Sequence, residues 1–143
     1  MVTIVDIIRA VSGRIETLFG EPPTTKDVTE GFDRPCTYVQ PALMRTAVEG
    51  ELRHDSFSVE ILRFADRTRK GYLDLLNCQA TLADALEKPI PVTEHFFVYP
   101  EEVAFDLRRE EMLLIASFSI ENFQLLSPED DEMETMEILV LKE

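Results

Sequence analysis

The chain has 143 residues, of which 45% are hydrophobic and 29% are charged, and this composition fits one globular domain with a real core. Its formal net charge of −14 disfavours the wrapping of nucleic acid, because such binding needs Lys and Arg to neutralise phosphates. No signal peptide opens the chain and no apolar run approaches the roughly 20 residues of a membrane span, so we expect a protein that is made and used in a cytoplasm.

The first predicted element is an amphipathic helix over residues 3–19. Thr3, followed three residues later by Asp6, makes a capping-box-like start, and Gly20 with the proline pair after it ends the helix. The apolar residues recur at helical spacing: Ile4, Ile7, Ile8, Val11, Ile15, Leu18 and Phe19. This spacing predicts one buried face.

A turn and a short strand are predicted next. Residues 24–28 are β-prone, residues 31–35 have turn chemistry, and residues 36–40 extend again. Pro41 at the end of this run indicates either an edge strand or a strand terminus, because proline has no N–H to donate to a sheet ladder.

Residues 51–64 alternate in the manner of a half-buried strand. One face carries Phe57, Val59 and Ile61, and the other carries Ser56, Ser58 and Glu60. At Leu62 and Phe64 the second face becomes apolar as well, which predicts that this end of the strand enters a covered region or an interface.

A second helix follows, with Asp66 or Thr68 as its cap. Its apolar stripe runs to Leu86, and the pair Lys88-Pro89 stops it. Strands are then predicted over residues 92–99, 103–107 and 112–123, with a polar hairpin loop over residues 108–111.

The order helix, strands, helix, strands predicts an α+β fold: a single domain with a mainly antiparallel β-sheet and two principal helices packed on it. Ser127-Pro128 and an acidic run break the pattern, and residues 135–141 then alternate again. We therefore expect a folded domain over residues 1–126 and an acidic C-terminal extension over residues 127–143 with a possible interaction strand. The extension carries seven acids and one lysine, which is −6 of the −14.

The sequence offers no convincing catalytic, cofactor-binding or metal-binding motif. His54 and His95 both fall inside strand-like segments, and no HExxH, CxxC or glycine-rich phosphate loop occurs. Cys36 and Cys78 are far apart and are expected to be ordinary buried or half-buried thiols. Adjacent acids such as Asp130-Asp131 lack the spacing of a calcium loop. We therefore predict a protein without a cofactor and without enzymatic activity.

One compact basic group, Arg67, Arg69 and Lys70, stands at the start of the second predicted helix. A basic cluster is disfavoured there by the helix dipole. It is either a solvated loop or a salt-bridge site for the acidic surface of a neighbouring subunit.

The layout resembles that of small phage and prophage tail terminator proteins over residues 3–126. The resemblance depends on the order of four features: the short opening helix, the Gly31-Phe32 turn with its Pro35-Cys36 strand entry, the Phe57/Val59/Ile61 strand, and the helix over residues 68–86. It implies a structural protein that caps the tail tube as a ring, commonly a hexamer, and that meets the tail tube protein on one side and a neck or head-completion protein on the other. It also implies a place in the virion tail or neck, with assembly in the host bacterial cytoplasm.

A ring is closed by a head-to-tail contact between two different surfaces of each subunit. The candidate interface residues are Arg67, Arg69, Lys70, Met136, Ile138 and Val140. A negative surface would also let DNA pass through the bore of such a ring without sticking. Two alternatives remain: an acidic DNA mimic that inhibits a DNA-binding enzyme, and a small metal-dependent hydrolase that uses the acidic loops.

Overall fold

The computed structural model describes residues 2–24 and 34–125. Helix α1 spans Ile4–Phe19, as the periodicity predicts. Its capping box is formed, with the Thr3 amide donating to the Asp6 carboxylate at 2.9 Å and the Asp6 amide donating to the Thr3 hydroxyl at 3.4 Å. Gly20 ends the helix in the left-handed conformation at φ 79°, which a residue without a Cβ adopts at little cost.

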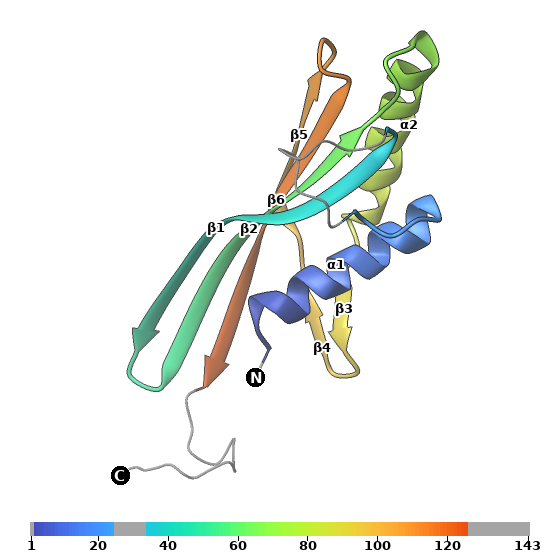
Figure 1. Cartoon of the computed structure of the whole chain (residues 1–143). Coiled ribbons are helices and arrows are strands. Elements are labelled where there is room, and N and C mark those ends of the chain that lie inside the picture. Colours follow the sequence, from blue (N-terminus) through green and yellow to red (C-terminus); the bar gives the residue numbers. More distant parts are fainter. Residues whose placement is uncertain (1, 25–33, 126–143) are drawn as a thin grey trace.

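Four long strands form one antiparallel sheet in the order β1-β2-β6-β5 (Figure 1). Strand β1 spans Cys36–Glu49, β2 spans Leu52–Phe64, β5 spans Glu101–Arg108 and β6 spans Leu113–Leu125. The turn between β5 and β6, residues 109–112, overlaps the predicted polar hairpin loop and is displaced from it by one residue. The fold class is therefore the predicted one, an α+β domain built on an antiparallel sheet.

Strand β1 corrects one of the two interpretations of Pro41. The strand does not end there but continues to Glu49, paired with β2 throughout. Pro41 is tolerated because β1 is an edge strand, and the register shifts between Pro41 and Leu43. The edge-strand interpretation is thus confirmed, and a strand terminus at Pro41 is wrong.

Helix α2 spans Arg69–Ala85 and is capped by Thr68 rather than by Asp66. The Thr68 hydroxyl accepts from the Gly71 amide at 3.1 Å. Gly71 is needed because a Cβ at this position would lie 2.0 Å from the carbonyl oxygen of Asp66. The segment before the helix therefore folds tightly back over its first turn.

The continuous strand predicted over residues 92–99 is wrong. The chain instead makes a small hairpin of β3, Ile90–Thr93, and β4, Phe96–Val98. His95 consequently lies in the turn of this hairpin and not inside a strand, whereas His54 lies in β2 as predicted. Glu94 and His95 form the turn of this hairpin, and Ile90 and Val98, which pair across it, are both buried.

The core lies between one face of the sheet, here called the inner face, and the layer formed by α1, α2 and the β3–β4 hairpin (Figure 1). Its most deeply buried members come from every one of these elements: Ile7, Val11, Ile15, Val59, Ile61, Leu75, Leu82, Ile90, Leu114, Phe118 and Ile120. The faces predicted from alternation in the second and last long strands are the ones that are buried.

A second, smaller apolar cluster covers the opposite or outer face of the sheet at one end. Tyr38, Phe64 and Leu113 are buried there, with Leu62 packed against them. The Arg34 guanidinium lies 5.2 Å from the centre of the Phe64 ring. This confirms that the end of β2 enters a covered region.

At its other end the sheet becomes a three-stranded arm, defined here as residues 41–57 and 120–125. Strand β5 accompanies β6 only as far as Ser119, so beyond that point β1, β2 and β6 continue alone. Figure 1 shows these three strands continuing together at the lower left, to the left of the β3–β4 hairpin. All residues of β1 within the arm are exposed.

Candidate interface surfaces

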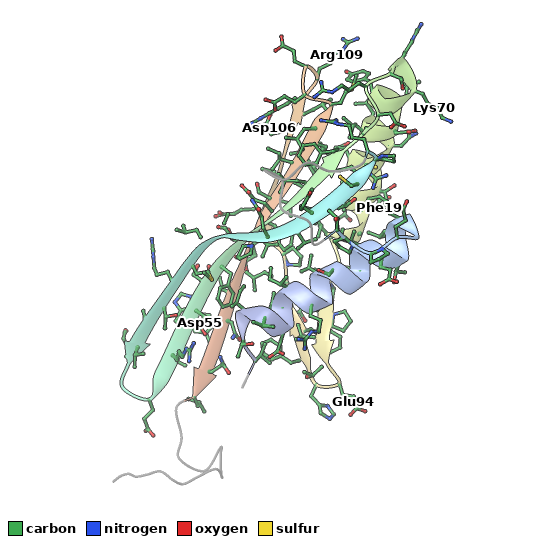
Figure 2. The ribbon with its side chains drawn as sticks, viewed as in Figure 1. Phe19, Asp55, Lys70, Glu94, Asp106 and Arg109 are labelled. Carbon is green, nitrogen blue, oxygen red and sulfur yellow. The ribbon has the colours of Figure 1, made fainter. Side chains whose placement is uncertain are left out.

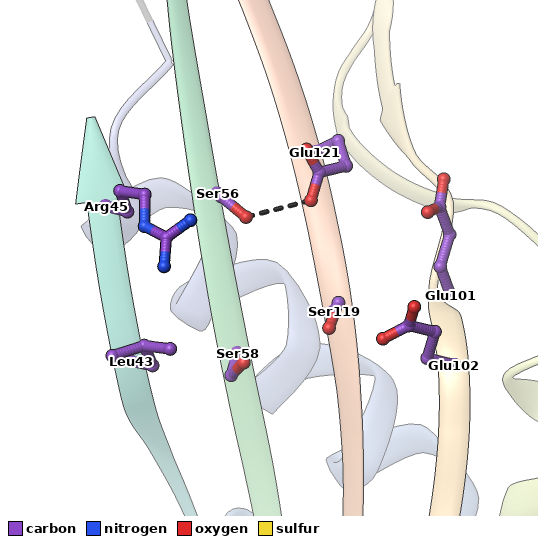
Figure 3. A pocket seen from close by; sticks show the side chains of 8 residues that line it. All are labelled: Leu43, Arg45, Ser56, Ser58, Glu101, Glu102, Ser119 and Glu121. Atoms are coloured by element: carbon purple, nitrogen blue, oxygen red, sulfur yellow. Dashed lines mark hydrogen bonds between the residues drawn. The ribbon is translucent and has the colours of Figure 1, made fainter. Parts of the chain in front are cut away.

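The outer face of the sheet is polar in its middle, where a shallow groove crosses all four strands (Figure 3). The groove is lined by Leu43, Arg45, Ser56, Ser58, Glu101, Glu102, Ser119 and Glu121. Ligand pockets are mostly apolar and occupy about 300–1,000 Å³. This groove holds about 290 Å³ and presents three carboxylates, so it is better described as an acidic surface than as a small-molecule site.

Glu121 ties β6 to β2 at the edge of this groove. Its carboxylate accepts a hydrogen bond from Ser56 at 2.8 Å and pairs with the His54 imidazole. The hydrogen bond from Ser56, and then the one from His54, hold the pKa of Glu121 below its usual range. Both the serine hydroxyl and the imidazole are bonded to the carboxylate, and among the described residues no hydrogen bond joins Ser56 to His54 as in a nucleophile–base pair.

A buried carboxylate braces the inner face of the arm. Asp55 is only 1% exposed, and it accepts from Thr46 at 2.7 Å and from Arg53 at 3.1 Å. Gln124 donates to Asp55 at 3.5 Å and to the carbonyl oxygen of Val2 at 3.3 Å. Burial raises the pKa of Asp55, but the hydrogen bonds from Thr46 and Arg53 outweigh it, so the net pKa is lowered.

Asp55 was not among the residues predicted to matter, although the sequence pattern around it carries a signal. Position 55 shares the alternating face of Phe57, Val59 and Ile61, where a carboxylate is out of place unless it is hydrogen-bonded. The partner Thr46 lies in the part of β1 for which no element was predicted. Without that pairing, the network could not be assembled.

The basic group of Arg67, Arg69 and Lys70 lies at the end of the sheet opposite the arm, exposed at the start of α2. Two contacts bring the β5–β6 turn to this group: Arg67 donates to the carbonyl oxygen of Glu110 at 3.2 Å, and Arg109 lies 4.6 Å from the ring centre of Tyr72. Figure 2 shows Arg109 and Lys70 at this same end of the molecule. Within the described residues, Arg69 and Lys70 form no ion pair. Their charges are therefore available to an outside partner.

The apolar interface candidates Met136, Ile138 and Val140 lie outside the described residues. The arm supplies a different set of exposed apolar side chains, which sequence reasoning missed: Leu43, Met44, Val48, Leu52, Phe123 and Leu125. The available signal was Gly50, which separates two β-prone runs. Gly50 takes φ 61° in the tight turn from β1 to β2.

The cysteines and the other possible metal ligands of the described residues are not brought together in one site. Cys36 is half-buried and Cys78 is buried, which raises the pKa of the Cys78 thiol. Among residues 2–24 and 34–125, no three His, Cys, Asp or Glu side chains gather as metal ligands would. Neither helix of this part of the chain has the length and apolar character of a bilayer span.

Comparison with known proteins adds one finding. The family model described as phage tail terminator protein matches residues 6–133. A search of curated proteins found no match. Because the family model covers most of the sequence, from the first turn of α1 past the end of β6, the chain belongs to the phage tail terminator family.

Proposed function

We propose that this protein caps the tail tube as an oligomeric ring and forms the tail side of the head–tail junction. Family membership establishes a structural role in the phage tail. The finer proposal has three parts: a ring of six copies, a contact with the tail tube protein on one face, and a contact with a neck or head-completion protein on the other.

The observation that carries the proposal is the exposed arm. Leu43, Met44 and Val48 are each exposed by more than half, as are Phe123 and Leu125. An apolar surface of this kind on a soluble domain marks a contact with another protein. A long polar-tipped hairpin with apolar sides is suited to lie against a neighbouring subunit.

The distribution of charge supports a head-to-tail contact. Arg69 and Lys70 lie at one end of the sheet, whereas β6 ends at the other, and the acidic run of residues 129–134 follows β6 in the sequence. A closed ring needs two different, complementary surfaces on each copy, and these two regions have opposite charge. We therefore propose that Arg67, Arg69 and Lys70 form intersubunit salt bridges.

The acidic outer face supports a role beside DNA without binding it. The groove presents Glu101, Glu102 and Glu121, and Arg45 is the only cation in its lining. Such a surface repels phosphates, so it suits a channel through which DNA passes. We propose that the protein is assembled in the host bacterial cytoplasm, binds no nucleic acid stably and has no enzymatic activity or cofactor.

Size-exclusion chromatography with light scattering tests the ring, with and without purified tail tube. We expect about six copies in a closed assembly that electron microscopy shows at the tube end. The double charge reversal Arg69→Glu/Lys70→Glu should weaken the ring, whereas Lys88→Glu, an exposed change beyond the other end of α2, should not. A protein that stays monomeric even with tube and that binds a nuclease tightly would instead support the DNA-mimic alternative.

A further inference from the structure

The outer edge of β1 is open along the arm. Strand β1 is terminal in the sheet, and within the described residues it pairs only with β2. Near its start the edge is occupied, because the Thr24 amide donates to the carbonyl oxygen of Thr37 at 2.8 Å. From Leu43 to Glu49 the described part of the chain supplies no such cover.

This stretch is apolar on both faces. The register places Leu43 opposite Ser58 on the outer face and Met44 opposite Phe57 on the inner face. Leu43 is 60% exposed, and Met44 and Val48 are each 57% exposed. A long, exposed and apolar edge is a template for another strand, and proteins normally blunt such edges.

The other edge of the sheet, formed by β5, has features that disfavour pairing with a further strand. Strand β5 carries Glu101, Glu102 and Asp106, and its register is irregular between Glu101 and Ala104. Glu102 also has φ 53°, which turns the backbone away from a regular ladder. In contrast, β1 from Leu43 to Glu49 is regular and carries one positive and one negative charge. An acidic strand is therefore repelled by β5 and not by β1.

A segment of the sequence beyond the described residues fits the open edge. Residues 135–141 alternate and are apolar on both sides, with Met136, Ile138 and Val140 on one side and Leu139 and Leu141 on the other. A strand of seven residues spans about 23 Å, the length of β1 from Leu43 to Glu49. The two residues that follow the segment, Lys142 and Glu143, carry opposite charges and add no net charge.

The distribution of charge favours residues 135–141 of a neighbouring copy over the same residues of the same chain. To reach its own β1 edge, the chain leaving β6 at Leu125 would have to cross the tip of the arm, where Glu49 and Glu51 stand. The acidic run of residues 129–134 would then lie against these two carboxylates. A segment arriving from another copy does not take this path. We propose that the β1 edge from Leu43 to Glu49 accepts residues 135–141 of a neighbouring copy as an added strand parallel to β1, an inference that rests on the proposed ring. In this direction Thr135 lies at the Leu43 end, so the acidic run enters away from Glu49 and Glu51.

Cysteine cross-linking in the full chain tests the pairing. In a background with Cys36 and Cys78 replaced by alanine, a tagged copy with Ile138→Cys is co-expressed with an untagged copy carrying Ala47→Cys or Val48→Cys, one on each face. Mild oxidation should link the two copies with one of these acceptors, at least ten-fold more than with the control Val103→Cys on β5. A single chain that carries both Ile138→Cys and the acceptor cysteine reports pairing within one copy. If links form only in that chain, or if the co-expressed copies link with neither acceptor, the inference is wrong.

A proline substitution separates this inference from the ring itself. Glu49 and Leu52 flank a two-residue turn and exchange hydrogen bonds, so the Val48 N–H points away from β2. Val48→Pro should remove a donor only from the added strand and shift the assembly to monomer without lowering the melting temperature of the monomer. The control Val48→Thr keeps the N–H and should keep the ring. A ring that persists with Val48→Pro overturns the edge pairing but leaves the proposed function standing, whereas a wild-type chain that forms no ring with tube overturns both.

Discussion

The substitution Phe118→Ala tests the assignment of the sheet faces most directly. Phe118 is 2% exposed and lies on the inner face of β6, directly opposite Val59. Removing its ring loses the transfer free energy of the apolar atoms and leaves a cavity between the sheet and the helices. Together these cost about 3–5 kcal/mol, which in a domain of this size lowers the melting temperature by about 10–20 °C.

The same strand supplies a matched control. Phe123 lies on the outer face of β6, is 58% exposed, and stacks on His54 with ring centres 4.2 Å apart. We expect Phe123→Ala to change the free energy of unfolding by less than about 1 kcal/mol. Urea unfolding should be followed at several protein concentrations, because assembly adds concentration-dependent stability. Equal losses for the two substitutions would refute the assignment of inner and outer faces.

Three further outcomes follow from the described contacts. The pKa of Asp55 is lowered on folding, so the ionised carboxylate stabilises the folded state above the unfolded-state pKa of about 4, and this stabilisation is lost as pH falls through the native pKa. Urea titrations from pH 7 to pH 2 should show a fall in the free energy of unfolding, and Asp55→Asn should make that fall smaller. Thr68→Ala should cost about 1 kcal/mol by removing the cap of α2, while Thr68→Ser should stay close to wild type, and an unchanged melting curve for the alanine variant would contradict the capping role. Duplex DNA should not bind at moderate salt, and tight, salt-sensitive retention in a gel-shift assay would contradict the repulsive outer face.

Much of the fold could be predicted because local patterns and packing agree. The Thr3 and Asp6 cap, the stripe of Ile7, Val11 and Ile15, and the alternation through Phe57 are each readable within a few residues. The half of β1 beyond Pro41 could not be read in this way. Its residues are exposed on both faces, so no buried face imposes a period of two on the sequence.

The candidate surfaces were harder to predict because they combine residues that are distant in sequence. The basic group was visible as Arg67, Arg69 and Lys70, but its extension by Arg109 depends on the β5–β6 turn lying beside α2. The groove likewise unites Ser56 with Glu101 and Glu121 across three strands. Only the sheet order brings these side chains together.

The continuity of β2 and β6 from the core into the arm has a mechanical consequence. The two strands are paired at thirteen positions, from Leu52 opposite Leu125 to Phe64 opposite Leu113, without a break. A pull on the arm along the strands loads these backbone bonds together, in shear, and does not unzip them one at a time from an end. The force is then delivered to Val59, Ile61 and Phe118, which belong to the buried core cluster that also includes residues of both helices. The arm is therefore built as a tension member anchored in the core, and not as a flexible appendage.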